Sequence, residues 1–134
     1  KGYFYATLAT AIEPGGASTQ PQIPDRGKAI KISRADGSVE FVAHGLRTPN
    51  GIGKGLDGEF FIADNQGDWL PASKILHLKP GAFYGSRSVN FAGTEGVAVT
   101  QPVVWLPRMK LAIRRASPLT LTKVITRAKC CTVR

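Results

Sequence analysis

Cysteine and long apolar runs are both scarce in this sequence. Only two of the 134 residues are cysteines, Cys130 and Cys131, and they are adjacent near the end of the chain. Adjacent cysteines match no metal-ligand spacing, and two of them do not indicate a redox compartment. No apolar segment is long enough to cross a bilayer, and no signal-peptide pattern opens the chain. We therefore expect no membrane span.

Acidic residues are missing from the last part of the chain. The net charge of +9 would by itself indicate nucleic acid or an acidic surface as a partner. Residues 1–107, however, hold ten Lys or Arg and nine Asp or Glu, whereas residues 108–134 hold eight Lys or Arg and no acid. The sequence therefore divides into a near-neutral body at 1–107 and a basic tail at 108–134.

The body also lacks helical periodicity, and its pattern is typical of short strands. Alternating apolar residues at 29–33 and 39–43 flank an Asp36-Gly37 turn and predict a hairpin. Further strands are expected at 2–12, 52–54, 59–63, 73–78 and 102–107, with loops at 13–27 and 90–96. Such spacing predicts an all-β sandwich, barrel or propeller, and the two repeated hairpin-plus-strand units favour a propeller of about two blades.

The segment from His44 to Trp69 is interpreted as the crossing from one blade to the next. Pro49 fixes its own φ, and the Asn50-Gly51 pair that follows is expected to turn with positive φ. The strand at 59–63 then opens into a polar loop that begins at Asp64. Polar side chains at the end of a buried strand are where a rigid scaffold presents chemistry.

Five polar residues of this segment are candidate ligands. Arg47 could hold an anionic cofactor or substrate through its planar head, or could bond carbonyl groups of the connection. Asn50 could ligate a metal ion through its amide oxygen, or form a turn. Asp64, Asn65 and Asp68 could supply oxygen ligands to calcium, or cap the loop. Three oxygens fall short of the six or more that calcium prefers, so other groups would have to contribute.

Three ring-bearing residues complete the set of candidates. Trp69 could stack against a sugar ring, or simply pack against the body. His44 and His77 are expected to be structural rather than catalytic.

Three segments, GGASTQPQ, GLRTPNG and DNQGDW, carry a resemblance that covers most of residues 2–107. The chain resembles six-bladed β-propellers of the glucose/sorbosone dehydrogenase-like group, found in large secreted bacterial proteins that also carry cytochrome-type haem domains. The resemblance implies an incomplete six-bladed β-propeller from a periplasmic or secreted sugar or polyol dehydrogenase. We expect natural amino-terminal residues to be missing. The fragment alone is expected to be inactive, because a propeller's central site draws on every blade.

The quinoprotein members of that group imply pyrroloquinoline quinone and calcium as cofactors. Arg47 matches the Arg of the family's quinone-contacting Arg-Asn pair, but Thr48 stands where the Asn would be. The sequence holds no counterpart of the family's catalytic His, so the catalytic residues are unknown. The oxidation would transfer a hydride from the sugar or polyol to the quinone, with a cytochrome-type haem domain as a further partner.

Two other functions fit the same residues. Metal-dependent lactonases of the gluconolactonase type also use a PNG-like segment whose Asn holds a divalent metal, and Asn50 matches that position. Their metal polarises the lactone carbonyl and activates water. The third function is a non-catalytic propeller that binds carbohydrate or docks a haem domain.

The basic tail is interpreted as out-of-frame translation. The propellers that the body resembles continue after Trp105-Leu106-Pro107 with Gln-Asn-Glu-Ile-Gly-Asn. A one-base shift near codon 107 permits that continuation, because codons for Pro107-Arg108-Met109-Lys110 can then be read as Gln-Asn-Glu. A frameshift explains the missing acids and the adjacent cysteines together, and no nucleic-acid partner is then expected. The alternative is a real basic tail that binds nucleic acid or anionic lipid.

Overall fold

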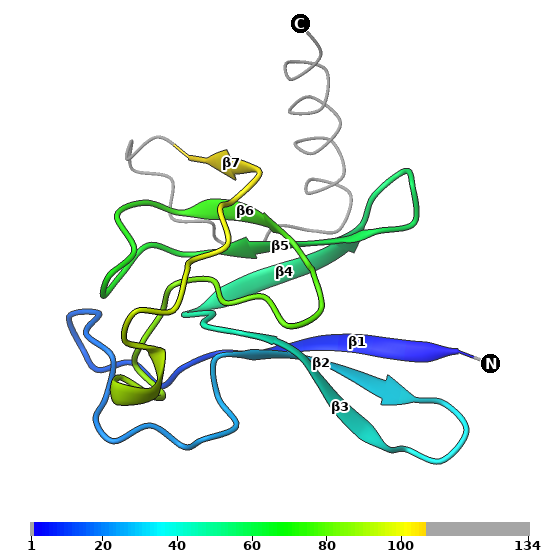
Figure 1. Cartoon of the computed structure of the whole chain (residues 1–134), viewed down its shortest axis with the longest axis horizontal. Coiled ribbons are helices and arrows are strands. Elements are labelled where there is room, and N and C mark those ends of the chain that lie inside the picture. Colours follow the sequence, from blue (N-terminus) through cyan, green and yellow to red (C-terminus); the bar gives the residue numbers. More distant parts are fainter. Residues whose placement is uncertain (1, 107–134) are drawn as a thin grey trace, which may run out of the picture.

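The computed structural model describes residues 2–106, which form short strands and one turn of 3-10 helix (Figure 1). The elements are β1 (Tyr3–Leu8), β2 (Lys28–Ser33), β3 (Val39–His44), β4 (Pro49–Lys54), β5 (Phe60–Asp64), β6 (Lys74–His77), η1 (Ala92–Thr94) and β7 (Val104–Trp105). They build two antiparallel sheets with the orders β1-β2-β3 and β4-β5-β6-β7. The all-β prediction is confirmed. Within residues 2–106 no helix is long and apolar enough to cross a bilayer.

The first sheet follows from the predicted hairpin. β2 pairs with β3, and the turn between them is held by the Asp36 carboxylate, which accepts hydrogen bonds from the backbone N–H and the hydroxyl of Ser38 at 3.1 and 2.8 Å. β1 pairs with the other edge of β2, in register from Tyr3 opposite Ser33 to Leu8 opposite Lys28. The strand expected at 2–12 therefore ends at Leu8.

The second sheet corrects one prediction. Asn50 and Gly51 do not form a turn with positive φ; they lie within β4, beside a shift of register between Pro49 and Gly51. Pairing of Gly51 with Ala63 on β5 extends the strand toward Pro49 and overrides the turn preference of the Asn-Gly pair. The predicted connection runs from one sheet to the other, since β3 ends the first sheet at His44 and β4 begins the second.

The main core lies between the two sheets. Ala29 and Ala43 of the first sheet share a buried cluster with Ile62 and Leu76 of the second. At the edge of this cluster the Tyr5 ring stacks on Phe60, with ring centroids 4.3 Å apart. The second sheet also has a smaller cluster of its own, made of Phe61, Ala63 and Ile75. Both faces of β5 are therefore buried.

The first sheet leaves its other face open. Register places Phe4 of β1, Ile32 of β2 and Val39 of β3 side by side, and Phe41 lies two pairs further along, on the same face. Phe4, Val39 and Phe41 are all more than half exposed. This apolar face has no second sheet against it in the described part of the chain.

The loops that follow β1 and β5 lie at the same end of the molecule (left in Figure 1), and the chain after β6 leaves at the opposite end and then runs back to it. The chain after β6 first returns to the first sheet, where the His44 N–H donates to the Ala82 carbonyl and the Tyr84 N–H donates to the His44 carbonyl, both at 3.0 Å. Gly45 permits this return, because a Cβ there would overlap the Phe83 ring and its φ is 77°. The loop end is therefore built from both sheets.

Candidate functional site

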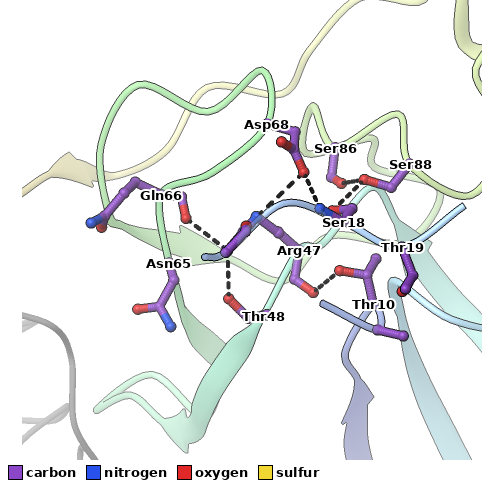
Figure 2. Close-up of polar contacts among 12 residues, drawn as sticks. Thr10, Ser18, Thr19, Arg47, Thr48, Asn65, Gln66, Asp68, Ser86 and Ser88 are labelled. Atoms are coloured by element: carbon purple, nitrogen blue, oxygen red, sulfur yellow. Dashed lines mark hydrogen bonds and ion pairs between the residues drawn. The ribbon is translucent and has the colours of Figure 1, made fainter. Parts of the chain in front are cut away.

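Arg47 lies at the centre of the loop end, in the connection between β3 and β4 (Figure 2). Its side chain is buried, and its two terminal nitrogens donate to the carbonyl of Gly16, to the carbonyl of Gln66 at 3.0 Å and to the Thr48 hydroxyl at 3.4 Å. The Nε atom lies 3.9 Å from a carboxylate oxygen of Asp68 and has no hydrogen-bond partner in the described residues. Arg47 thus bonds carbonyl groups, but these belong to the loops after β1 and β5 and not to the connection in which the sequence predicted them.

Asp64, at the end of β5, anchors the backbone of that connection. Its fully buried carboxylate accepts hydrogen bonds from the backbone N–H groups of Arg47 (3.2 Å), Thr48 (3.0 Å) and Asn65 (3.1 Å). It also accepts one from Lys74 Nζ on β6 at 3.1 Å. A buried carboxylate with this many donors has a structural role. We call Asp64 and its four donor residues, Arg47, Thr48, Asn65 and Lys74, the Asp64 junction.

Lys74, the partner of Asp64, is not among the residues predicted from the sequence. Its side chain is 1 % exposed, and burial lowers the pKa of the ammonium group below its usual value, while the Asp64 carboxylate opposes that shift. Removing either partner would leave the other as an uncompensated buried charge. The two residues therefore form one unit within the second sheet.

Asp68 connects the Asp64 junction to the loop after β1. Its carboxylate accepts a hydrogen bond from the Ser18 N–H at 2.9 Å, and hydrogen bonding to Ser18 holds the pKa of Asp68 below its usual value. The Ser18 hydroxyl in turn accepts from Ser88 at 3.0 Å. The backbone carbonyl of Arg47 accepts two further hydrogen bonds, from the N–H and from the hydroxyl of Thr10, at 2.7 and 2.9 Å.

The residues predicted to bind calcium are not gathered around one point. Asp64 is enclosed by its own donors, Asp68 faces Ser18 and Arg47, and the Asn65 side chain points away from Asp68 in Figure 2. In residues 2–106 no three His, Cys, Asp or Glu side chains form a group that could hold a metal ion. Asn50 lies on β4, where it has an interaction within the chain.

Quinone contact through Arg47 also lacks a fitting donor set. Both terminal nitrogens of the guanidinium are bonded within the chain, and Gly67 covers the remaining Nε so closely that a Cβ at position 67 would overlap it. Quinone and calcium binding therefore remain proposals for a longer protein.

Trp69 lies at the mouth of an aromatic cleft, which we define by Trp69, Phe91 and Trp105. The cleft has a volume of about 470 Å³, and Arg87 contributes to its lining. The Trp69 and Phe91 rings are tilted against each other with centroids 5.9 Å apart, and their side chains are 51 % and 59 % exposed. The structure thus adds three residues to the predicted sugar-stacking position.

The two histidines lie apart. The His44 ring is near Phe83, with centroids 5.1 Å apart, whereas His77 Nε2 forms an ion pair with Glu59 at 3.0 Å when protonated. The predictions for 108–134, including Cys130 and Cys131, lie outside the described residues.

Comparison with known proteins identifies no relative: no family model, no curated protein and no solved structure matches the chain.

Proposed function

We propose that this chain is part of a β-propeller that binds a sugar or polyol, with the sugar ring resting in the aromatic cleft. The observation that carries the proposal is the exposure of Trp69 and Phe91 beside Trp105 around a volume of about 470 Å³. Binding sites for small molecules are concave and lined mainly by apolar and aromatic groups, with few polar ones. Arg87 is the polar group here, and its guanidinium can donate to sugar hydroxyls.

The backbone of Trp69 supports a binding role. Its φ is 62°, and it is the one residue other than glycine with positive φ in residues 2–106. A bulky side chain in this left-handed region is strained, and such strain gathers at functional sites. The strained backbone holds an indole ring half exposed at the cleft, where it gains little from packing.

The propeller part of the proposal rests on the two sheets. Each is an antiparallel meander, the second has four strands, and they pack face to face, as neighbouring propeller blades do. The apolar face around Phe4, Val39 and Phe41 is suited to packing against another sheet. A longer protein with further blades would cover it.

The enzymatic functions are proposals for that longer protein. The residues of 2–106 do not provide a fitting quinone or metal site, so quinone-dependent oxidation, lactone hydrolysis and an extracytoplasmic location rest on the sequence resemblance. Both enzymatic functions and the non-catalytic alternative require recognition of a sugar-like ligand. The cleft supports that recognition and no particular one of the three.

Tryptophan fluorescence tests the proposal directly, because the only two tryptophans of the chain, Trp69 and Trp105, both line the cleft. The full chain is titrated with glucose, sorbitol and a β-linked oligosaccharide. Saturable quenching or a blue shift is expected, since a bound ring removes water from the indoles. An unchanged spectrum with all three ligands at concentrations up to about 100 mM would overturn the proposal, because a dissociation constant above that value means negligible affinity.

Two phenylalanines of nearly equal exposure provide a matched control. Phe91→Ala removes a cleft ring and is expected to weaken binding at least about fivefold, whereas Phe4→Ala removes a ring of the first sheet and is expected to leave binding unchanged. Equal losses in both variants would contradict a site at the cleft. Dye reduction with added quinone and calcium, and lactone hydrolysis with added divalent metal, then identify either enzymatic alternative.

A further inference from the structure

A second cavity, of about 450 Å³, lies beside the segment that also lines the aromatic cleft. Gly85, Arg87 and Phe91 line the cleft, whereas Ser86 and Asn90 line the cavity. The opposite wall comes from β2, β3 and the loop before β2, through Arg26, Lys28 and His44. This cavity plays no part in the proposed sugar site.

The lining of the cavity carries an excess of positive charge. Arg26 and Lys28 both contribute to it, and no Asp or Glu of residues 2–106 lines it. Arg26 uses one terminal nitrogen to donate to the Ala9 carbonyl at 3.2 Å, which leaves further N–H groups of its five for a ligand. The Lys28 ammonium lies 3.4 Å from the Asp25 carboxylate and 3.9 Å from the centre of the Phe41 ring. The ion pair with Asp25 is exposed and offsets the charge only weakly.

His44 adds a titratable donor to the same wall. Within the described residues its imidazole has a ring contact with Phe83 and no hydrogen bond or ion pair. Burial, and then the charge of Lys28, lower the pKa of His44 below its usual value. An anion in the cavity would oppose both effects, because it would pair with the imidazolium and offset the charge of Lys28.

We propose that this cavity binds an oxyanion, the carboxylate or phosphate group of a small organic ligand, through Arg26, Lys28 and His44. Guanidinium, ammonium and imidazole groups are the usual partners of such oxygens, and charge-assisted hydrogen bonds to them are the strong ones. The volume leaves room for more than the anionic group, and Ser86 and Asn90 can hydrogen-bond the remainder of the ligand.

The two histidines of the chain make the proposal measurable by proton NMR of the full chain. His44 lines the cavity, whereas His77 lies on β6 beside Glu59 and serves as an internal control. The imidazole signals are followed across pH in sodium chloride, inorganic phosphate and acetate at equal ionic strength, and His77→Gln assigns them. Tenfold tighter binding to the imidazolium would raise the His44 pKa by up to about one unit.

A rise in the pKa of His44 without a matching rise for His77 supports the proposal. An effect of phosphate alone assigns a phosphate group, an effect of acetate alone assigns a carboxylate, and effects of both assign a general oxyanion site. No shift at His44, or equal shifts at both histidines, would overturn it. This result needs no variant in the cavity.

Two lysines of one strand sharpen the test. Lys28→Gln is expected to lower the apparent affinity for the anion, measured through the His44 pKa shift, about fivefold. Lys31→Gln is expected to leave that affinity unchanged. Lys31 forms an exposed ion pair with Glu40 and does not line the cavity. Because Lys28→Gln also relieves repulsion of the imidazolium, each variant is compared with itself in sodium chloride.

Discussion

The Asp64 junction and the aromatic cleft draw on one loop but place its side chains in opposite environments. Asp64 is fully buried and accepts hydrogen bonds from several backbone N–H groups and from Lys74. Trp69, five positions later, is half exposed on a strained backbone. The comparison separates stability from binding: changes at the junction should unfold the chain, whereas changes at the cleft should alter only what it binds.

The largest effect is expected from Lys74→Met. The variant leaves the Asp64 carboxylate buried without its counter-ion, which should lower the free energy of unfolding by about 3–5 kcal/mol. Urea-induced unfolding, followed by tryptophan fluorescence, measures the change. Lys31→Met removes an exposed ion pair and is the matched control, with an expected loss under about 1 kcal/mol. Similar losses in both variants would remove the distinction between junction and surface.

A smaller loss is expected from Gly67→Ala. A Cβ at position 67 would overlap the Arg47 guanidinium, whose hydrogen bonds oppose its displacement. Overpacking of this kind costs about 1–3 kcal/mol in the free energy of unfolding. Gly2→Ala is the control, because the new methyl group would meet only the flexible Arg34 side chain, and its effect should stay within about 0.5 kcal/mol. A neutral Gly67→Ala would show that Arg47 is not held in place.

Asp68 lies between the two regions and predicts a pH dependence. The pKa of Asp68 in the folded chain is below the usual 3.8. The ionised carboxylate therefore stabilises the folded chain above pH 3.8, and this contribution is lost as the pH falls through the pKa of the folded chain. Asp68→Asn should therefore lower stability at pH 6 and have less effect near pH 2. Urea unfolding at both pH values measures the difference, and an equal effect at the two values would contradict the role of the charge.

The smallest effect on stability is expected from Trp69→Gly. Glycine relieves the strain at φ 62°, which offsets the loss of a half-exposed ring, so the free energy of unfolding should change by less than about 1 kcal/mol. Sugar binding, followed through the remaining Trp105, should nevertheless be lost. A large loss of stability would instead make Trp69 a packing residue, its other predicted role.

The sequence predicts the strands well, because alternation and turn chemistry are local signals. The hairpin around Asp36 and Gly37 is found where the pattern places it, and the loop at 13–27 is found as well. Asn50-Gly51 fails because pairing with β5 overrides its turn preference. Local preference is reliable only where no neighbouring strand competes with it.

The site is less predictable, because its partners lie far apart in sequence. Arg47 and Asp64 are both candidates from the sequence, yet nothing local indicates that Gly16 would accept from the guanidinium or that Lys74 would meet the carboxylate. Phe91 likewise joins Trp69 only through the return of the chain after β6. The available signal for Lys74 is a charged residue at a strand position that should be buried.

The Asp64 junction also constrains how this sequence can change over evolution. A neutral residue at position 74 would be tolerated only after position 64 has lost its charge, and a side chain at position 67 only after Arg47 has been replaced. Among related sequences, positions 64 and 74 should therefore vary as a pair, and position 67 should depart from glycine only together with position 47. Of the aromatic cleft, Trp105 shares this coupling, because Lys74 Nζ lies over its ring at 5.8 Å from the centroid. Trp69 and Phe91 are free of it and can diverge one at a time as the ligand changes.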